Sequence, residues 1–527
     1  MEYKIFFLAI MIFVSSLLTI LGNRIRVAYP VLLVLSGLVI SFLPFVPDIK
    51  IDPEVIFYIF LPPLLYMSAM TLPLKDVLSW KRVILSFAFI VVFLTAAGIG
   101  LLAAWLVPGM TLAMGMMLGG ILAPTDAVSA TTIMQQVKVP SRISTILEGE
   151  SLLNDASALI TFSFALIAVQ TGSFVVEKAL LSLLWMVFGG AAVGMLIGRL
   201  FVHLHKVMPD KDPHVIIVFT LIAPYLMYIV AEVVGASGVL AVVFGGFYMS
   251  KHIYLVDSYS RMLGKSVWDN LIFVLNGIAF MLIGLDLPQI MEGMVADGIS
   301  IGSATIFALI VLAAIMILRM LCAYLSIPLS RIRRKSRHLG YDLIVDSPTA
   351  FIVGWCGMRG VISLAAALSI PYLLNSGEPF PLRSLVLYCS FIVILGTLVI
   401  QGLSLPWFLK RIHFPEYGDL LGHDETYSLI RRGLAESGLK YLEEHPVDNE
   451  EDRLVFEYIK ERWQKRLVID SKDSLMKSVI SNYRNILVAQ RNYLFKLSKE
   501  RKDIDEEIIR SFHRRIDMEE ERLKREL

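Results

Sequence analysis

The sequence predicts an all-α, polytopic membrane protein with a charged helical tail. Hydrophobic residues make up 56% of the 527 positions, more than is usual in a soluble domain. Charge is concentrated at the end of the chain, where residues 413–527 contain 22 Lys or Arg and 25 Asp or Glu. We therefore expect two domains, a transmembrane domain at 1–412 and a cytoplasmic helical domain at 413–527.

Thirteen apolar segments follow one another through the first domain. Each is near the roughly 20 residues that an α-helix needs to cross a bilayer. They lie at about 5–21, 28–46, 54–71, 83–106, 111–134, 145–170, 179–202, 214–234, 237–250, 267–285, 300–327, 347–371 and 384–409. The first segment has no small-residue cleavage site, so we expect a membrane span there rather than a signal peptide.

Basic residues alternate between successive loops of the first domain. One set of loops contains 20 Lys or Arg, and the other set contains only Lys4, Lys50, Lys178 and Arg383. Loops rich in Lys and Arg stay in the cytoplasm. The N-terminus is therefore expected outside and the tail inside. The short N-terminus and the lack of extracellular glycosylation features lead us to expect a bacterial inner membrane.

Two spans are predicted to be broken helices. The fifth, at 111–134, contains a glycine pair and Pro124 before Asp126, and the twelfth, at 347–371, contains three glycines around Arg359. Proline removes a backbone donor, and glycine weakens a helix. Their positions fit inverted six-span repeats whose broken helices meet near the middle of the membrane, as in many transporters.

Acidic residues inside the apolar segments are candidate functional groups, because a carboxylate at bilayer depth is costly and usually faces a polar cavity or a partner. Asp126 and Asp155 are two such residues, and Ser151 lies four positions before Asp155, on the same helix face. A small cation prefers several oxygen ligands. Asp155, Ser151, and Thr125 or a freed backbone carbonyl could supply them. We predict that a monovalent metal ion and a proton compete for Asp155.

Arg359 needs an anionic partner if it is buried. Glu150, Asp126 and Asp155 are the candidates, and a role as a brace between helices is the alternative. Arg319 lies near the cytoplasmic end of its predicted span. We expect its side chain to extend to that interface.

Two other classes of function use similar residues. An intramembrane aspartyl protease would need Asp126 and Asp155 as an acid pair around one water, but nothing else indicates a peptide channel, so an enzyme is disfavoured. An ion channel is the nearer alternative. It passes current down a gradient, whereas an exchanger couples cation flux to proton flux. The sequence indicates no cofactor and no nucleic-acid partner.

Five segments together resemble the monovalent cation:proton antiporters, which include the eukaryotic sodium/proton exchangers and bacterial NhaP-type proteins. They are APTDAVSATTI, LEGESLLNDASALITF, YIVAEVVGASGVLAVV, FVLNGIAFMLIGLDL and GMRGVISLAAALSIP. The resemblance covers most of 1–412, and the order PTD, GESLLND, GxRG is specific. It implies thirteen spans, inverted repeats, a homodimer, and alternating access by an elevator-like movement of an ion-carrying core. We expect a role in pH homeostasis, with salt export as the alternative.

The resemblance also implies the residues of the site. It makes Asp155 the exchange carboxylate and Glu150–Arg359 the supporting ion pair. The remaining residues that it places around the ion or proton are Thr125, Asp126, Ser151 and Asn154.

The same resemblance bears on the ion. The Asn-Asp form, here Asn154-Asp155, implies electroneutral exchange, with Na+ the first expected cation and K+ or Li+ the alternatives. One departure lies in LPPLLYMSAM, where Met67 and Ser68 stand at positions at which family members often carry an acid. A third acid in that span is therefore not expected to take part in binding.

Overall fold

The computed structural model describes residues 2–25, 29–42, 56–134, 139–172, 176–207, 212–335, 346–414 and 423–444, with short stretches between 456 and 520. The chain divides into two compact units, Met1–Pro415 and Glu416–Leu527. In the described residues every regular element is a helix, and one isolated bridge joins Leu373 to Pro379. The all-α prediction is confirmed. The functional assignment of 1–412 and 413–527 stays a prediction.

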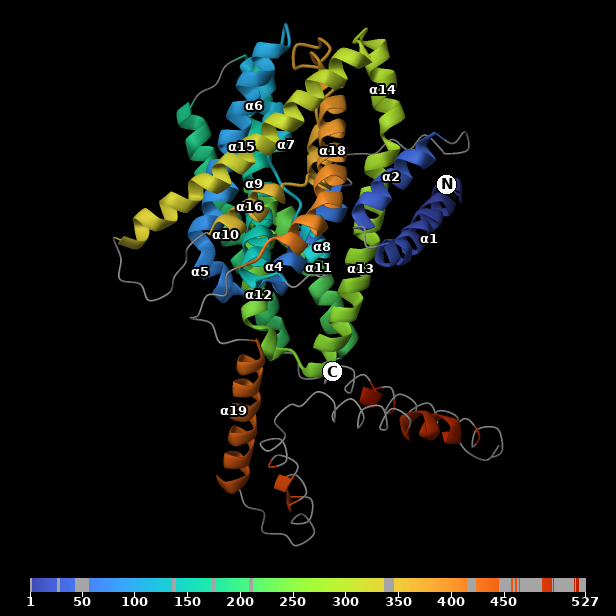
Figure 1. Ribbon diagram of the computed structural model, residues 1–527, viewed down its shortest axis with the longest axis vertical. Coiled ribbons are helices and arrows are strands. Elements are labelled where there is room, and N and C mark those ends of the chain that lie inside the picture. Colours follow the sequence, from blue (N-terminus) through green and yellow to red (C-terminus); the bar gives the residue numbers. More distant parts are fainter. Residues whose placement is uncertain are drawn as a thin grey trace. The chain divides into compact units, whose positions relative to one another are not determined.

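The first unit is a succession of helices that overlap all thirteen predicted segments (Figure 1). In chain order they are α1 (Glu2–Ile25), α2 (Tyr29–Ser41), η1 (Ile56–Phe60), α4 (Leu61–Thr71), α5 (Leu74–Leu85), η2 (Ser86–Val91), α6 (Val92–Leu106), α7 (Leu112–Leu122), α8 (Ala127–Met134), α9 (Ser141–Thr171), α10 (Val176–Val207), α11 (Pro213–Val233), α12 (Gly238–Lys251), η3 (Ile253–Leu255), α13 (Ser258–Leu285), α14 (Leu287–Ala296), α15 (Ile301–Lys335), α16 (Ser347–Trp355), α17 (Val361–Leu368) and α18 (Arg383–Arg411).

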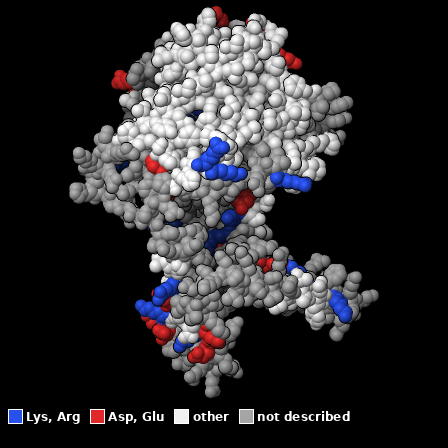
Figure 2. Space-filling view, viewed as in Figure 1, with Lys and Arg blue, Asp and Glu red and all other residues white. Residues whose placement is uncertain are grey.

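Length and composition of these helices fit a membrane protein. Among the described residues, eight helical stretches are long and apolar enough to cross a bilayer, and four shorter apolar helices accompany them. Figure 2 shows a described surface that is mostly free of charged side chains over this unit, as expected of a surface that faces lipid. The polytopic fold agrees with the prediction, whereas the exact number of thirteen crossings stays a prediction.

Both predicted helix breaks are present. The fifth segment is divided into α7 and α8, and the twelfth into α16 and α17. The backbone N–H of Asp126 donates a hydrogen bond to the carbonyl of Met358 at 2.7 Å. The two interrupted segments therefore meet main chain to main chain, between residues far apart in the sequence.

The glycine pair before Pro124 has a different role from the predicted one. Helix α7 continues through Gly119 and Gly120 and ends only at Leu122. A side chain at Gly119 would place its Cβ 2.6 Å from the backbone of Ala96, and one at Gly120 would lie 3.0 Å from the backbone nitrogen of Phe162. The two glycines let α7 pack closely between α6 and α9, as small residues do in membrane helices.

The helices around this crossing form the framework of the site. Helix α9 packs against α7, α8 and α5, and α15 packs against α16, α18 and α6. In Figure 1, α1 and α2 lie beside α13, while α15 slants across the region that contains α16 and α18. A π-helix, η2, lies opposite α9. There the Ser157 hydroxyl donates a hydrogen bond to the carbonyl of Ala88, as wide turns of this kind often leave a carbonyl accessible.

The second unit contains α19 (His423–Glu444). Ion pairs one turn apart, Arg432–Glu436 and Lys440–Glu444, follow its exposed side. Arg491 pairs with Glu520 at 2.6 Å in the same unit. These charged, helical residues agree with the expected composition of the tail.

Candidate functional site

A cavity of about 330 Å³ lies against the crossing of the broken helices and reaches Asp155. Residues of α4, α8, α9, α13 and α17 line it, together with the link between α7 and α8. Thr71, at one end of the lining, is exposed, Ser68 is partly buried, and Asp155 is only 4% exposed. The cavity therefore leads from solvent at the end of α4 to the carboxylate that the sequence singles out.

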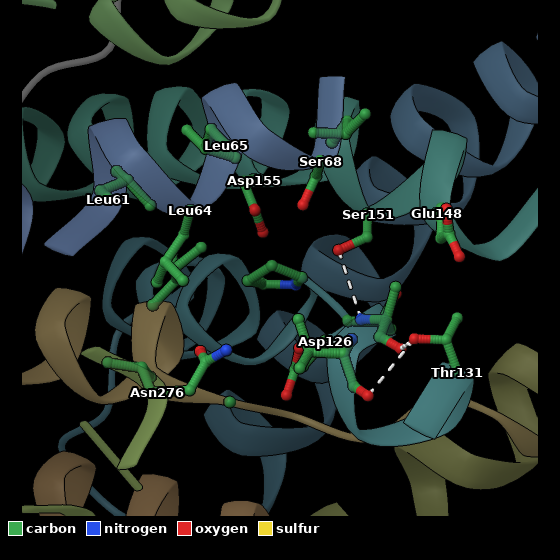
Figure 3. A pocket seen from close by; sticks show the side chains of 18 of the residues that line it. Leu61, Leu64, Leu65, Ser68, Asp126, Thr131, Glu148, Ser151, Asp155 and Asn276 are labelled. Atoms are coloured by element: carbon green, nitrogen blue, oxygen red, sulfur yellow. Dashed lines mark hydrogen bonds between the residues drawn. The ribbon is translucent and has the colours of Figure 1, made fainter. Parts of the chain in front are cut away.

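Asp155 lies among oxygen atoms from two helices. Figure 3 shows its carboxylate and the hydroxyls of Ser68 and Ser151 turned toward the same space. Ser151 lies one turn before Asp155 on α9 and accepts a hydrogen bond from the backbone N–H of Ala127 at 3.4 Å. Within the described ranges, no hydrogen bond or ion pair engages the Asp155 carboxylate. It is available to a cation or a proton.

Asp126 is the N-cap residue of α8. Its carboxylate accepts a hydrogen bond from the backbone N–H of Val128 at 2.9 Å and another from the hydroxyl of Ser129 at 2.8 Å. A Cβ at Gly360, which precedes α17, would lie 2.8 Å from the Cβ of Asp126. One negative charge therefore lies beside the starts of two half-helices, where the helix dipole favours an anion.

Arg359 lies at the C-terminal ends of the other two half-helices, α7 and α16. Its Nε donates to the carbonyl of Leu122, the last residue of α7, at 2.9 Å, and its guanidinium also donates to the carbonyl of Gly357, just after α16. Its backbone N–H donates to the Thr397 hydroxyl at 3.1 Å. The side chain is 1% exposed. A buried cation here satisfies carbonyls that the helix breaks leave without partners.

The ion pair of Glu150 differs from the expected one. Glu150 pairs with Arg319, whose two terminal nitrogens donate to the two carboxylate oxygens at 2.6 and 3.0 Å. The implied Glu150–Arg359 pair is therefore wrong for this structure, because the carbonyls at the helix breaks engage the guanidinium of Arg359.

The expectation that Arg319 extends to the interface is also wrong. Helix α15 continues to Lys335, so Arg319 is near its middle rather than near its end. The side chain is 3% exposed and points inward to Glu150. Two-point contact of this kind is the strong geometry of an arginine–carboxylate pair.

A short chain of hydrogen bonds joins this ion pair to the link between α7 and α8. The Asn154 side chain donates to the Thr125 hydroxyl at 2.9 Å, and that hydroxyl donates to Glu150 at 3.3 Å. Thr125 lines the cavity, whereas Asn154 and Glu150 do not. Of the predicted ion-binding residues, the structure thus brings Thr125, Asp126, Ser151 and Asp155 to the cavity wall and places Asn154 behind it.

Several polar lining residues were not predicted as parts of the site. Glu148 and Asn276 line the cavity, and so does Ser68, which the sequence marked only as a departure from a family pattern. The spacing of Glu148, Ser151 and Asp155 at i, i+3 and i+7 on one helix face is the signal that could have found Glu148.

Comparisons with known proteins agree with this architecture. The family model described as "Sodium/hydrogen exchanger, transmembrane" matches residues 10–411. An uncharacterized Na+/H+ exchanger of Mycobacterium tuberculosis is 31% identical over 434 residues, which cover 80% of this chain and 77% of the relative. A sodium, potassium, lithium and rubidium/H+ antiporter of Bacillus pumilus is 30% identical over 438 residues, covering 81% of this chain and 63% of the relative.

A solved structure supports the fold independently. The sodium proton antiporter MjNhaP1 from Methanocaldococcus jannaschii superposes with a TM-score of 0.61 at 20% identity, covering 78% of this chain and 99% of that chain. At this identity the likeness bears on the fold alone. Taken with the family match over most of the first unit, it follows that this chain belongs to the transmembrane sodium/hydrogen exchanger family of monovalent cation:proton antiporters.

Proposed function

We propose that this chain exchanges a monovalent cation, Na+ first, for H+ across a membrane, and that Asp155 binds the cation or the proton in turn. One observation carries the proposal: the Asp155 carboxylate lies at the buried end of a cavity, beside the hydroxyls of Ser68 and Ser151. Asp155, Ser151 and Thr125 are the proposed ligands, with K+ or Li+ as alternatives to Na+. The Bacillus pumilus relative is named as an antiporter of sodium, potassium, lithium and rubidium.

Desolvation makes the exchange obligatory. An unpaired carboxylate in a low-dielectric environment costs free energy, so the loaded forms of Asp155 are favoured over the empty ionised form. A bound proton and a bound Na+ each neutralise the same single charge. The site therefore changes sides with either one or the other, which is the basis of one-for-one exchange by alternating access.

The buried charges around Asp155 support electroneutral exchange. Glu150 and Arg319 form an ion pair, and the negative charge of Asp126 is matched by the positive charge of Arg359 at the other helix ends. These charges cancel in pairs. The summed charge of these groups and Asp155 then changes only with the loading of Asp155, which is neutral with either substrate bound.

The positions of basic residues support an orientation of the cavity relative to the membrane. Thr71, at the exposed end of the cavity, is followed in the sequence by Lys75, Lys81 and Arg82. These residues lie in α5, and basic residues near the ends of membrane spans stay in the cytoplasm, so we propose that the cavity faces the cytoplasm in this conformation. The proposal includes an outside N-terminus, a cytoplasmic tail, a homodimer in a bacterial inner membrane, and a role in pH homeostasis.

Proteoliposomes with a preset pH gradient test the proposal. Added Na+ should dissipate the gradient through the wild-type protein, K+ and Li+ should be compared in parallel, and Asp155→Asn should abolish the response. The rate should not depend on an imposed membrane potential. Wild-type exchange by Asp155→Asn would overturn the proposal, and uncoupled cation current would indicate a channel.

A further inference from the structure

A third carboxylate, besides Asp126 and Asp155, lies in the same cavity and is more exposed than Asp155. Glu148 lines the cavity and precedes Asp155 by seven residues on α9. At 1.5 Å per residue this separates the two by about 10 Å along the helix, with Ser151 between them on the same face. Figure 3 shows Ser151 between Glu148 and Asp155.

Glu148 has the solvent exposure expected of a residue on the path of a cation from solvent to Asp155. It is partly buried, whereas Asp155 is nearly inaccessible and Thr71 is exposed. The hydroxyls of Thr71, Thr131 and Ser68 line the same cavity. Polar residues of the lining therefore include exposed, intermediate and buried positions, and Glu148 is one of two lining acids of intermediate exposure, the other being Asp126.

The charge of Glu148 is uncompensated by its described surroundings. No hydrogen bond or ion pair engages its carboxylate in the part of the chain that the structure describes. Among the residues that line the cavity there is no Lys, Arg or His. Asp126, the other lining acid at this depth, is already engaged as a helix cap. A negative charge in a cavity whose walls are partly apolar concentrates cations near it.

We infer that Glu148 is a vestibule site, at which a monovalent cation is held before it reaches Asp155. This inference rests on the proposed function. The vestibule site supplies a negative charge besides those of Asp126 and Asp155, while the polar group that α4 places beside Asp155 is the neutral Ser68. Glu148 acts on the arrival of the cation and takes no part in the exchange step itself.

The inference predicts an effect on apparent affinity rather than on maximal rate. Glu148→Gln should raise the apparent KM for Na+ by about threefold to tenfold at low ionic strength and leave the maximal rate near the wild-type value. Salt of an inert organic cation should reduce this difference, because exposed charges are screened over about 10 Å at moderate ionic strength. Glu148→Asp keeps the charge and should stay within about twofold of wild type.

The experiment measures Na+-dependent proton flux in proteoliposomes over an ionic-strength series. Asp269→Asn is the matched control, since Asp269 is an exposed acid of α13 outside the cavity lining. Its KM should not change. Glu148→Ala is a second neutral variant if Glu148→Gln does not accumulate. An unchanged KM at low ionic strength would overturn the inference, as would a rise in KM that salt does not reduce.

The two proposals fail separately. If Asp155→Asn remains active, the proposed function is wrong whatever Glu148 does. If Asp155→Asn is inactive and Glu148→Gln behaves as wild type, only the vestibule site is wrong. A loss of maximal rate in Glu148→Gln with unchanged KM would also contradict the inference, because it would indicate a structural or catalytic role.

Discussion

Glu150 and Arg319 form a two-point ion pair that is almost entirely buried, with N–O distances of 2.6 and 3.0 Å. The pair joins α9, which contains Asp155, to α15, which packs on α16 and α18. Through Thr125 it also contacts the link between α7 and α8. The pair therefore holds three parts of the site in register without lining the cavity itself.

Breaking this pair from one side should destabilise the protein. Arg319→Gln leaves Glu150 as a buried uncompensated charge, so we expect a loss of about 3–5 kcal/mol in the free energy of unfolding. Combining it with Glu150→Gln should recover much of the loss. Thermal unfolding in detergent measures both, with Asp269→Asn as an exposed-charge control. Equal stability of Arg319→Gln and wild type would contradict the buried pairing.

Replacing Gly360 should disturb the capping of α8. The Cβ of Gly360→Ala would lie 2.8 Å from the Cβ of Asp126 and 3.0 Å from its carboxylate, so one of the two segments must move. We expect a destabilisation of about 1–3 kcal/mol, as for other overpacked sites, together with reduced exchange. Gly302→Ala in α15 is the control, because its nearest neighbour would be 3.9 Å away. If Gly360→Ala changes stability and exchange no more than the control does, the close contact between Gly360 and Asp126 contributes to neither.

Asn154 and Thr125 should behave as one unit. Each of Asn154→Ala and Thr125→Val removes the hydrogen bond between them, so their effects on unfolding free energy should not add. The coupling energy expected for one such bond is about 0.5–1.5 kcal/mol. A double-mutant cycle of thermal stability measures it, with Ser129→Ala as a substitution outside this bond. Additive effects would argue against the link.

The exchange should depend on pH through competition. Under the proposed function, protons and Na+ compete for the Asp155 carboxylate, so a fall in pH on the side of the cavity should raise the apparent KM for Na+, by at most about tenfold per pH unit for one displaced proton. Saturating Na+ should restore the rate. Initial rates over a grid of pH and Na+ concentration provide the check. A maximal rate that falls with pH at constant KM would mean that separate groups bind the two ions.

Particular residues show what the sequence could and could not predict. Proline and charge inside apolar runs marked the breaks at Pro124 and Arg359, because both conflict with a continuous buried helix. The i, i+4 spacing placed Ser151 beside Asp155 correctly. These predictions succeeded because each depended on a single segment.

Contacts between segments were harder to predict from the sequence. The partner of Glu150 depends on how α15 packs and on how far α15 extends beyond residue 327. The hydropathy of the span predicts neither of these. Asn154 and Asp155 are neighbours in sequence, but successive helical residues point in different directions, so only Asp155 lines the cavity. A glycine pair in a sequence is compatible with a helix break and with close helix packing, so the sequence alone could not show which role Gly119 and Gly120 have.

The hydrogen bond from Asp126 to Met358 uses only atoms that every residue other than proline provides at those places. Replacing either side chain therefore leaves this hydrogen bond available, provided that residue 126 is not proline. Variants that differ in the side chains around Asp155 should accordingly keep the two interrupted segments joined through their main chains.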